Sequence, residues 1–353
     1  MKRIANRTTK SATTRNRAVG RRAAGLLTAL LLVAAASGCG NDSSAASGHG
    51  NKVTFGYIAD YSGSAALAVA QKQGLWKKAG LKPELKVFTN GPLQVQALGS
   101  GDLDFGYLGP GALWLPASGR APIVSVNMLG LADRVIARPG SGITKPADLK
   151  GKKVAVAEGT SGDMILDLAL RNAGLKPTDV KKVAMDASTV VTAFSSGQVD
   201  AAATWYPLID TIKKKVPGLR EISGTQDYYP GLTFPNVFVA QPRLASGNPA
   251  LVRKVTGVLK QADDWIAGHP AQSESVAAGF LGLPAAQLKG STDHVKILSS
   301  AELTKLSRNG TVDGWFDQLS DLFVQMKKLP KPEKAKDYYL GDLYASAGKA
   351  DHR

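Results

Sequence analysis

The sequence predicts an α/β protein built from two similar lobes that two crossings of the chain join. Three observations favour this class. The pentapeptide AGLKP occurs twice, at 79–83 and at 173–177. Residues 97–106 align without gaps with residues 193–202, at an offset of 96. Apolar segments with the lengths and periods of strands and helices alternate through both regions, which is typical of βαβ units and a parallel sheet.

The first lobe is expected to follow one local order of elements. A strand at 53–58 leads to a helix at 64–78, which AGLKP ends; a strand at 84–88, a second helix, a Ser-Gly turn and a strand at 104–107 follow. Gly80 suits the left-handed position just past a helix end, and Pro83 prevents the helix from resuming. The pentapeptide is therefore interpreted as a helix stop.

The second lobe repeats this order. A strand at 153–158 leads to a helix at 161–172 and the second AGLKP; a strand at 180–185, a helix, a Ser-Gly turn and a strand ending near Thr204 follow. Gly174 and Pro177 occupy the places of Gly80 and Pro83. Two units this long do not make a solenoid, because the period is too long and the copies too few.

The crossings are expected where extended apolar runs link the lobes. Residues 120–142 hold two such runs around Gly130, interpreted as the last strand of the first lobe and a crossing segment, and 232–240 carries the chain back. Lobe 1 is thus predicted at 52–134 plus 236–353, and lobe 2 at 135–235. After 242 the pattern is helical, with a helix that Asn248 caps and Gly268 ends, and a second region at 299–330 broken by a glycine.

The N-terminus is predicted to be an export signal. Residues 1–22 are basic, 23–36 are apolar but short for a membrane span, and ASGC leads into Cys39, the only cysteine. A lone cysteine can be a buried, inert thiol. Here its position resembles a bacterial lipobox, which implies a signal peptide at 1–38 and a lipid on Cys39. The Gly/Ser-rich residues 39–51 are interpreted as a flexible tether. Export by the general or by a twin-arginine route stays open, because Arg21–Arg22 is followed by residues that fit the second poorly.

Composition limits the function classes. The formal charge of +16 includes eight basic residues and no acid in 1–38, and the other charges are spread along the chain. No basic block alternates with aromatic residues, so nucleic acid is not expected as a partner. The body has no apolar run of eighteen residues that would span a membrane. We therefore expect a globular body, extracytoplasmic and held at the bacterial cell membrane through its anchor.

Several motifs together carry a family resemblance. SGDLDFGYLGPGAL, ITKPADLKGKKVAV, EGTSGDM, AGLKPTDV and SGQVDAAATWYPLI resemble the solute-binding proteins of ABC importers, in the taurine, alkanesulfonate and nitrate branch, from about Lys52 to Tyr344. The resemblance implies the type II periplasmic binding protein fold, two Rossmann-like lobes that close over a ligand. It also implies a monomer that works with permease and ATPase subunits and carries no cofactor or metal.

The resemblance also places the ligand site in the loops that follow the strands and at the crossings. The residues that match those positions are Asp60, Tyr61, Asn90, Gly109, Pro110, Gly111, Asp133, Thr160, Ser161, Trp205, Tyr206 and Asn236.

Individual site positions allow two interpretations each. Thr160 and Ser161 at a helix start can bind an anion through hydroxyls and unpaired N–H groups, or Thr160 is an ordinary N-cap. Trp205 can cover an aliphatic chain or an ammonium group, or it is a core residue. The branch often has an acid where Tyr206 and Asn236 stand, which weakens taurine as the ligand. Asp133, Asp60 and Asp163 remain candidate partners for a ligand amine, or they cap helices or face solvent.

The function that follows is capture of a small sulfonate such as taurine or an alkanesulfonate. Nitrate, bicarbonate and a thiamine-precursor pyrimidine stay open as ligands. Enzymes such as desulfinases and pyrimidine synthases share the fold, but we expect no catalysis, because no body cysteine can act as a nucleophile. His49, His269, His294 and His352 lie outside the predicted pocket loops, and no metal-ligand spacing is present.

Overall fold

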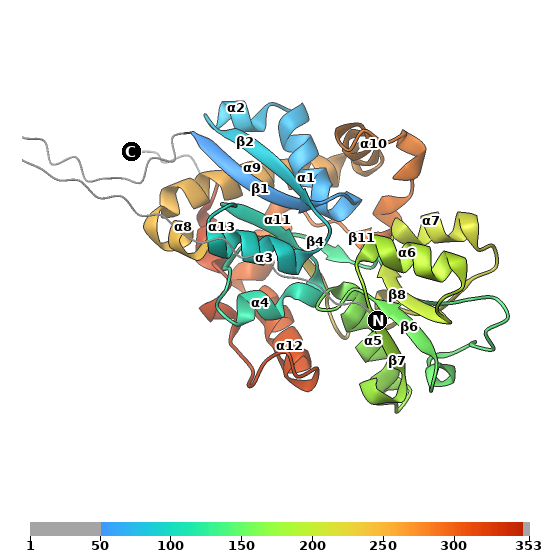
Figure 1. The fold of residues 1–353 in the computed structure, drawn as a ribbon. Coiled ribbons are helices and arrows are strands. Elements are labelled where there is room, and N and C mark those ends of the chain that lie inside the picture. The colour runs from blue at the N-terminus through green and yellow to red at the C-terminus, as the bar shows by residue number, and fades with distance from the viewer. Residues whose placement is uncertain (1–50, 349–353) are drawn as a thin grey trace, which may run out of the picture. The chain divides into compact units, whose positions relative to one another are not determined.

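Two β-sheets organise the computed structural model, which describes residues 51–348 (Figure 1). Within these residues the first sheet has the strand order β11-β4-β10-β3-β1-β2 and the second the order β7-β6-β8-β5-β9. The first sheet consists of β1 (Lys52–Ile58), β2 (Lys82–Phe88), β3 (Phe105–Leu108), β4 (Ile123–Gly130), β10 (Pro235–Ala240) and β11 (Val295–Lys296). The second consists of β5 (Asp133–Ala137), β6 (Lys153–Val156), β7 (Lys181–Ala184), β8 (Ala201–Trp205) and β9 (Arg220–Gly224).

The predicted repeat is present in both sheets. Strand β1 pairs in parallel with β2 and β3, and β6 pairs in parallel with β7 and β8. The matching helices are α1 (Tyr61–Lys72), α2 (Leu75–Lys78) and α3 (Gly91–Ser100) in the first copy, and α5 (Ser161–Asn172) and α6 (Ala187–Ser196) in the second.

Both AGLKP segments end helices as predicted. Gly80 has φ 67° and Gly174 has φ 70°, in the left-handed region that favours glycine. The N–H of Leu81 donates to the Trp76 carbonyl, and the N–H of Leu175 to the Leu170 carbonyl, both at 2.8 Å. These bonds satisfy carbonyl groups that a helix end leaves free.

The prediction of parallel sheets was incomplete, because both sheets are mixed. Strand β10 runs antiparallel to β3 and β4, and β5 runs antiparallel to β8 and β9. Each antiparallel strand enters its sheet from the other sheet, so it runs against the strands of the local repeat. The second apolar run, expected to be a crossing segment, is strand β5 itself.

The chain changes sheets at Leu131–Ala132, before the predicted boundary at 134/135, and returns between β9 and β10. We call the parts built around the first and second sheets lobe 1 and lobe 2. Their division as separate domains stays a prediction.

The C-terminal part is helical, as expected. Its helices are α8 (Pro242–Gly247), α9 (Pro249–Gly268), α10 (Pro270–Phe280), α11 (Ser300–Arg308), α12 (Thr311–Gln325) and α13 (Gly341–Ser346). The Asn248 side chain accepts from the Leu251 N–H at 3.1 Å and caps α9. Gly310, with φ 79°, separates α11 from α12. Short helices α4 (Trp114–Ala117) and α7 (Leu208–Lys215) complete the α-helices of residues 51–348.

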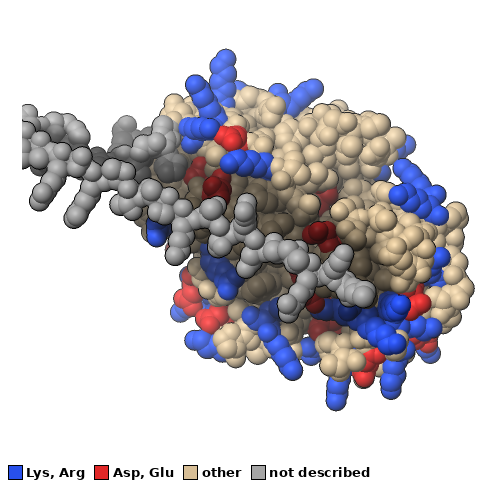
Figure 2. Space-filling model, in the orientation of Figure 1, with Lys and Arg blue, Asp and Glu red and all other residues tan. Residues whose placement is uncertain are grey.

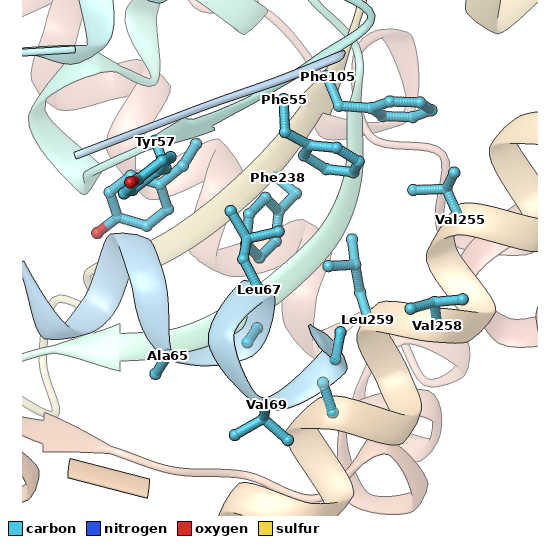
Figure 3. Packing of buried hydrophobic residues seen from close by; sticks show 14 of the residues in the cluster. Phe55, Tyr57, Ala65, Leu67, Val69, Phe105, Phe238, Val255, Val258 and Leu259 are labelled. Atoms are coloured by element: carbon cyan, nitrogen blue, oxygen red, sulfur yellow. The ribbon is translucent and has the colours of Figure 1, made fainter. Parts of the chain in front are cut away.

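A packed core fixes the first sheet against its helices. Phe55, Phe105 and Phe238 project from three strands toward side chains of α1 and α9 (Figure 3). The rings of Phe55 and Phe105 stack at a centroid distance of 4.9 Å. Burial of each such side chain stabilises the fold by roughly 1.5–3 kcal/mol. The core therefore holds the strand ends, from which the site is built, in fixed positions.

Charged side chains are scattered over the face of the molecule that Figure 2 shows. Lys and Arg side chains project at several places along the outline in this view, and some acids lie among them. No helix within residues 51–348 is long and apolar enough to cross a membrane. The predicted signal peptide, Cys39 and nearly all of the predicted tether lie outside the described residues.

Candidate functional site

A cavity of about 40 Å³ lies where the carboxyl ends of strands from both sheets meet. It has room for a few water-sized groups. Ten predicted site residues line it: Asp60, Asn90, Gly109, Pro110, Asp133, Thr160, Ser161, Trp205, Tyr206 and Asn236. Gly91, which shares the predicted loop with Asn90, also lines it. Lining residues that the sequence did not suggest are Ile58, Ser62, Tyr107, Ala112, Gly130 and Ala132. The structure thus brings together segments that are far apart in the chain.

Three helix N-termini meet at this cavity. Asp60 caps α1 and accepts from the Gly63 N–H at 2.8 Å, and Asn90 caps α3 and accepts from the Leu93 N–H at 3.0 Å. Thr160 is the N-cap of α5, but its hydroxyl turns back and donates to the Ala157 carbonyl at 2.6 Å. Helix α5 therefore has no side-chain cap, and its first-turn N–H groups have no intrahelical acceptor.

Two buried carboxyl groups belong to the cavity wall. Asp60 precedes α1 in lobe 1, and Asp133 is the first residue of β5 in lobe 2; their exposed fractions are 7% and 3%. Burial raises the pKa of Asp60 to about 7, and the charge of the nearby Asp133 adds to this rise. Hydrogen bonds from the Gly63 N–H and the Trp205 indole act in the opposite direction and lower it. Burial raises the pKa of Asp133 to about 6, although a hydrogen bond from the Ser161 hydroxyl lowers it.

Trp205 reaches across the cleft. Its indole Nε1 donates to Asp60 Oδ2 at 3.1 Å, which links lobe 2 to the N-terminus of α1. The ring is also buried against Ala157 and Ala187. Trp205 is thus both a packed residue and part of the cavity wall, so the two interpretations of its sequence position are compatible.

Tyr206 also connects the lobes. Its ring stacks on the imidazole of His294, with centroids 3.8 Å apart and an interplanar angle of 12°. His294 ends the 3-10 helix Ser291–His294 that precedes β11. The Tyr206 hydroxyl is bonded to Glu221 and to Lys213. Its polar end is therefore occupied by these two partners. His294 does not line the cavity, but it supports a residue that does.

Two predicted site residues lie beside the cavity rather than in its wall. Tyr61 is a core residue whose hydroxyl bonds to Ser273 Oγ at 2.5 Å. A Cβ on Gly111 would lie 2.2 Å from the Thr160 carbonyl oxygen, so the backbones of the two lobes meet there. Gly111 thus allows a close approach of the lobes.

Tyr107 was missed because it lies inside a strand. Its hydroxyl donates to Asn236 Oδ1 at 2.7 Å, across 129 residues of sequence. Burial raises the pKa of Tyr107 well above its usual range, and the charges of Asp60 and Asp133 act in the same direction. The only local signal was its place next to the carboxyl end of a predicted strand, beside Gly109.

Asp163 is not in the cavity wall, although the sequence suggested it as a partner for a ligand amine. Its carboxylate accepts from the Gly159 N–H at 2.9 Å and pairs with Lys182 at 3.0 Å and Lys328 at 3.1 Å. Burial alone would raise the pKa of Asp163, but these three partners together hold it below its usual value. Asp163 is a paired structural carboxylate, so its lone pairs are already used.

Known proteins share this architecture. A family model described as "NMT1/THI5 like" matches residues 62–273. The chain belongs to this family. A candidate binding protein of Brucella abortus (strain 2308) is 51% identical over 294 residues, which cover 83% of this chain and 92% of that protein. The taurine-binding periplasmic protein of Escherichia coli is 27% identical over 250 residues, covering 67% and 77%.

Solved structures agree on the fold of this NMT1/THI5-like protein. The periplasmic aliphatic sulphonate binding protein SsuA from Escherichia coli matches with a TM-score of 0.62 and 26% identity, covering 83% of this chain and 98% of that chain. The desulfurization enzyme DszB matches with a TM-score of 0.61 at 16% identity, covering 84% and 98%, which shows the fold alone. The type II periplasmic binding fold and the predicted family resemblance are confirmed.

The described residues offer no ready metal centre. No group of three or more His, Cys, Asp or Glu side chains within residues 51–348 is placed to hold a metal ion. The two cavity carboxyls, the uncapped α5 terminus and the aromatic rings of Tyr107 and Trp205 are the groups that can contact a small solute.

Proposed function

We propose that this protein is the extracytoplasmic substrate-binding component of an ABC importer and captures a small sulfonate, with taurine as the favoured ligand. The observation that carries the proposal is the cavity between the two lobes, toward which three helix N-termini converge. Such a site suits a receptor that closes over a solute. The relatives named for taurine and aliphatic sulfonates support the ligand class.

The sulfonate group would lie at the N-terminus of α5. The backbone N–H groups of its first turn and the helix dipole favour an anion there. The Thr160 hydroxyl donates to Ala157, so backbone groups rather than this hydroxyl would contact the ligand. Charge-assisted hydrogen bonds contribute roughly 1.5–3 kcal/mol each. A few of them suffice for micromolar binding, about −8 kcal/mol.

A thiamine-precursor pyrimidine is the second candidate ligand. The two carboxyl groups can accept from amino and ring N–H groups, and the rings of Tyr107 and Trp205 offer flat apolar surface. Nitrate and bicarbonate have no N–H group or apolar part to use these features. An enzymatic role on the same fold would need an activated nucleophile or a base. Among the described residues, the cavity wall offers two carboxyls and several hydroxyls but no His, Lys or Cys side chain.

The location and partners in this proposal follow from the sequence and the relatives. A lipid on Cys39 would hold the protein at the outer face of the cell membrane, where it hands its ligand to permease and ATPase subunits. The E. coli taurine-binding relative is periplasmic by name. Radiolabelled palmitate incorporated into the wild-type protein but not into Cys39→Ala would support the anchor. Incorporation into both would contradict it.

Calorimetric titration of the purified protein tests the ligand class. The panel contains taurine, ethanesulfonate, a longer alkanesulfonate, nitrate and the pyrimidine. We expect micromolar or tighter binding of taurine, with no turnover when the mixture is analysed by mass spectrometry. Binding of the pyrimidine alone would contradict the sulfonate as ligand and support the thiamine-precursor pyrimidine instead. Chemical conversion of any bound compound would show that the protein is an enzyme rather than a receptor.

A further inference from the structure

The cavity is acidic, although the predicted ligands are anions or carry an anionic group. Its wall contains two carboxyl groups, Asp60 and Asp133, and none of the lining residues drawn from positions 51–348 is Lys, Arg or His. A simple anion in this cavity would meet two negative groups and no side-chain cation. Buried charges of one sign require a partner of the opposite sign or must be neutralised by protons.

Asp133 has capacity for another partner. Its Oδ1 atom is buried and has no hydrogen-bond partner among the described residues, while the Ser161 hydroxyl bonds to the carboxyl group. The side chain is only 3% exposed and lines the cavity. An unpaired acceptor in such a position is costly unless a ligand donor completes it.

The nearest cation does not neutralise this carboxyl directly. Arg134 Nε pairs with Glu221 at 2.8 Å, and Arg134 Nη1 donates to the carbonyls of Leu131 and Asp133, both at 2.8 Å. The guanidinium therefore fixes the backbone of the crossing. Its field favours ionised Asp133 but leaves the free carboxylate oxygen unpaired.

Asp60 and Asp133 belong to different lobes, so they approach each other when the cleft closes. The groups around them are neutral: Tyr107 of β3, Asn236 of β10, Ser161 of α5 and Trp205 of β8. We infer that the ligand carries a protonated amine, and that Asp60 and Asp133 are the residues that recognise it from the two sides of the cleft. This inference rests on the proposed solute-binding function and narrows its substrate class.

The inference explains how charge would control closure. Two carboxylates brought together across an empty cleft repel each other, whereas an ammonium group between them attracts both. The raised pKa values of Asp60, about 7, and of Asp133, about 6, mean that the empty, closed site holds about one proton at pH 6.5. A ligand ammonium would replace them, so capture should release protons. Aminosulfonates and aminopyrimidines meet this requirement, whereas nitrate, bicarbonate and plain alkanesulfonates do not.

Matched ligands and variants test the inference by calorimetry at pH 6.5 on the purified full-length protein. The ligands are taurine, ethanesulfonate, which lacks only the amine, and the aminopyrimidine. The proteins are wild type, Asp60→Asn, Asp133→Asn and a control, Asp337→Asn, which changes an exposed acid. Titration in two buffers of different ionisation enthalpy measures protons released on binding. Thermal unfolding checks that each variant folds. The Asp133→Asn variant decides whether the inference holds, because it keeps the shape of the side chain and removes its charge.

We expect taurine or the aminopyrimidine to bind at least thirtyfold more tightly than ethanesulfonate, with proton release. Asp133→Asn should lose at least tenfold in affinity for the amine ligand and less than twofold for ethanesulfonate, and Asp337→Asn should match wild type. Equal binding of taurine and ethanesulfonate, unchanged in Asp133→Asn, would overturn the inference but leave a sulfonate receptor. Asp133-dependent binding of the aminopyrimidine alone would support it and overturn the sulfonate proposal. Binding of no amine ligand would overturn it.

Discussion

The two lobes share a framework but supply different chemistry to the cleft. Helices α1 and α5 have twelve residues each and begin at the cavity. The first is capped by the Asp60 carboxylate, which accepts from the helix's own N–H group. The second begins at Thr160, whose hydroxyl turns away to Ala157. The α1 terminus is thus occupied by its own cap. The first turn of α5 contains Asp163, but that carboxylate is paired with Lys182 and Lys328, so the first-turn N–H groups remain suited to an external acceptor.

The same contrast appears one element later. At the repeat offset, Gly109 after β3 corresponds to Trp205 at the end of β8. Lobe 1 continues into Pro110 and Gly111, where the backbone approaches lobe 2 closely. Lobe 2 supplies aromatic rings at this position. The repeat therefore preserves the residues that end helices and turn strands, whereas the residues that face the ligand have diverged between the copies.

The largest effect is expected where the lobes meet. In Gly111→Ala the new Cβ would lie 2.2–2.4 Å from the Thr160 carbonyl and the Ser161 nitrogen, which are backbone atoms that cannot move aside. The cleft should therefore fail to close, and ligand affinity should fall about a hundredfold, roughly 2.7 kcal/mol. Calorimetry with the ligand that binds wild type measures this.

The matched control for this change is Gly99→Ala in α3. Nothing lies within 4 Å of the added Cβ there, and alanine is the better helix former. Affinity in the control should equal that of wild type. An unchanged affinity in Gly111→Ala would show that ligand binding does not need the two lobes to meet at this point.

Each lobe contains a buried acid whose contribution to the free energy of unfolding can be measured. Asp163 in lobe 2 is paired with Lys182 and Lys328, and Lys328 follows α12, so this pair also bridges to lobe 1. Asp163→Asn should lower the free energy of unfolding by about 2 kcal/mol at pH 7, since both lysines are partly exposed and relax. Urea titration measures the loss, and Lys328→Met, which removes one cation, should show a smaller loss.

The effect of Asp163 should depend on pH in a defined direction. Its folded-state pKa lies below the unfolded value of about 3.9. The carboxylate therefore stabilises the fold above that value and loses its contribution as the pH falls through the folded-state pKa. Wild type and Asp163→Asn should converge in stability near pH 2. A difference that stays constant with pH would mean that lost packing, not lost charge, explains the variant.

The acid in the core of lobe 1 is expected to behave in the opposite way. Asp263 of α9 is 2% exposed, and neither carboxyl oxygen has a partner among the described residues. Burial raises its pKa well above the usual range, with a further rise from Asp264. The folded state then holds a proton that the unfolded chain releases, so stability falls as the pH rises above about 3.9.

Asp263→Asn should thus raise the free energy of unfolding by about 1 kcal/mol at pH 8 and change it little at pH 4. Asp264→Asn is the control, because Asp264 accepts from Ser300 and its removal should slightly destabilise at both pH values. Destabilisation by Asp263→Asn at pH 8 would show that the ionised carboxylate has a stabilising partner.

The smallest effect concerns the contact between Tyr206 and His294. Burial and the neighbouring Arg134 lower the pKa of His294, so the imidazole stacks in its neutral form at pH 7. His294→Ala should weaken ligand binding about threefold, the value of one aromatic contact of roughly 0.5–1 kcal/mol. His294→Phe should restore affinity because it keeps a flat ring. Equal affinity in both variants and wild type would show that the contact does not stabilise the closed lobes.

Local patterns in the sequence predict the framework well. A glycine with positive φ followed by leucine and proline is a helix stop that needs no distant partner, and both copies have this form. Asn248 likewise caps the helix that follows it. The duplicated AGLKP and the gapless match between residues 97–106 and 193–202 were enough to place the repeat.

Interactions between distant residues could not be predicted in this way. The antiparallel direction of β5 depends on which sheet it joins, and the bond from Tyr107 to Asn236 joins strands 129 residues apart. The Asp163–Lys328 pair and the Tyr206–His294 stack also bring distant segments together. Such contacts produce no periodic pattern in the local sequence. The sequence therefore suggested Asp163 as a ligand partner and gave no signal for His294.

Small-angle X-ray scattering tests most directly whether this is a two-lobed receptor that closes over its solute. The radius of gyration of the purified protein is measured without ligand and at saturating taurine, or the aminopyrimidine if that is the ligand that binds. Contacts of the ligand with both lobes should shift the protein toward the closed form, so we predict a larger radius without ligand and a decrease on saturation. The same radius in both states, at a concentration where calorimetry shows full occupancy, would contradict closure of the lobes over the ligand.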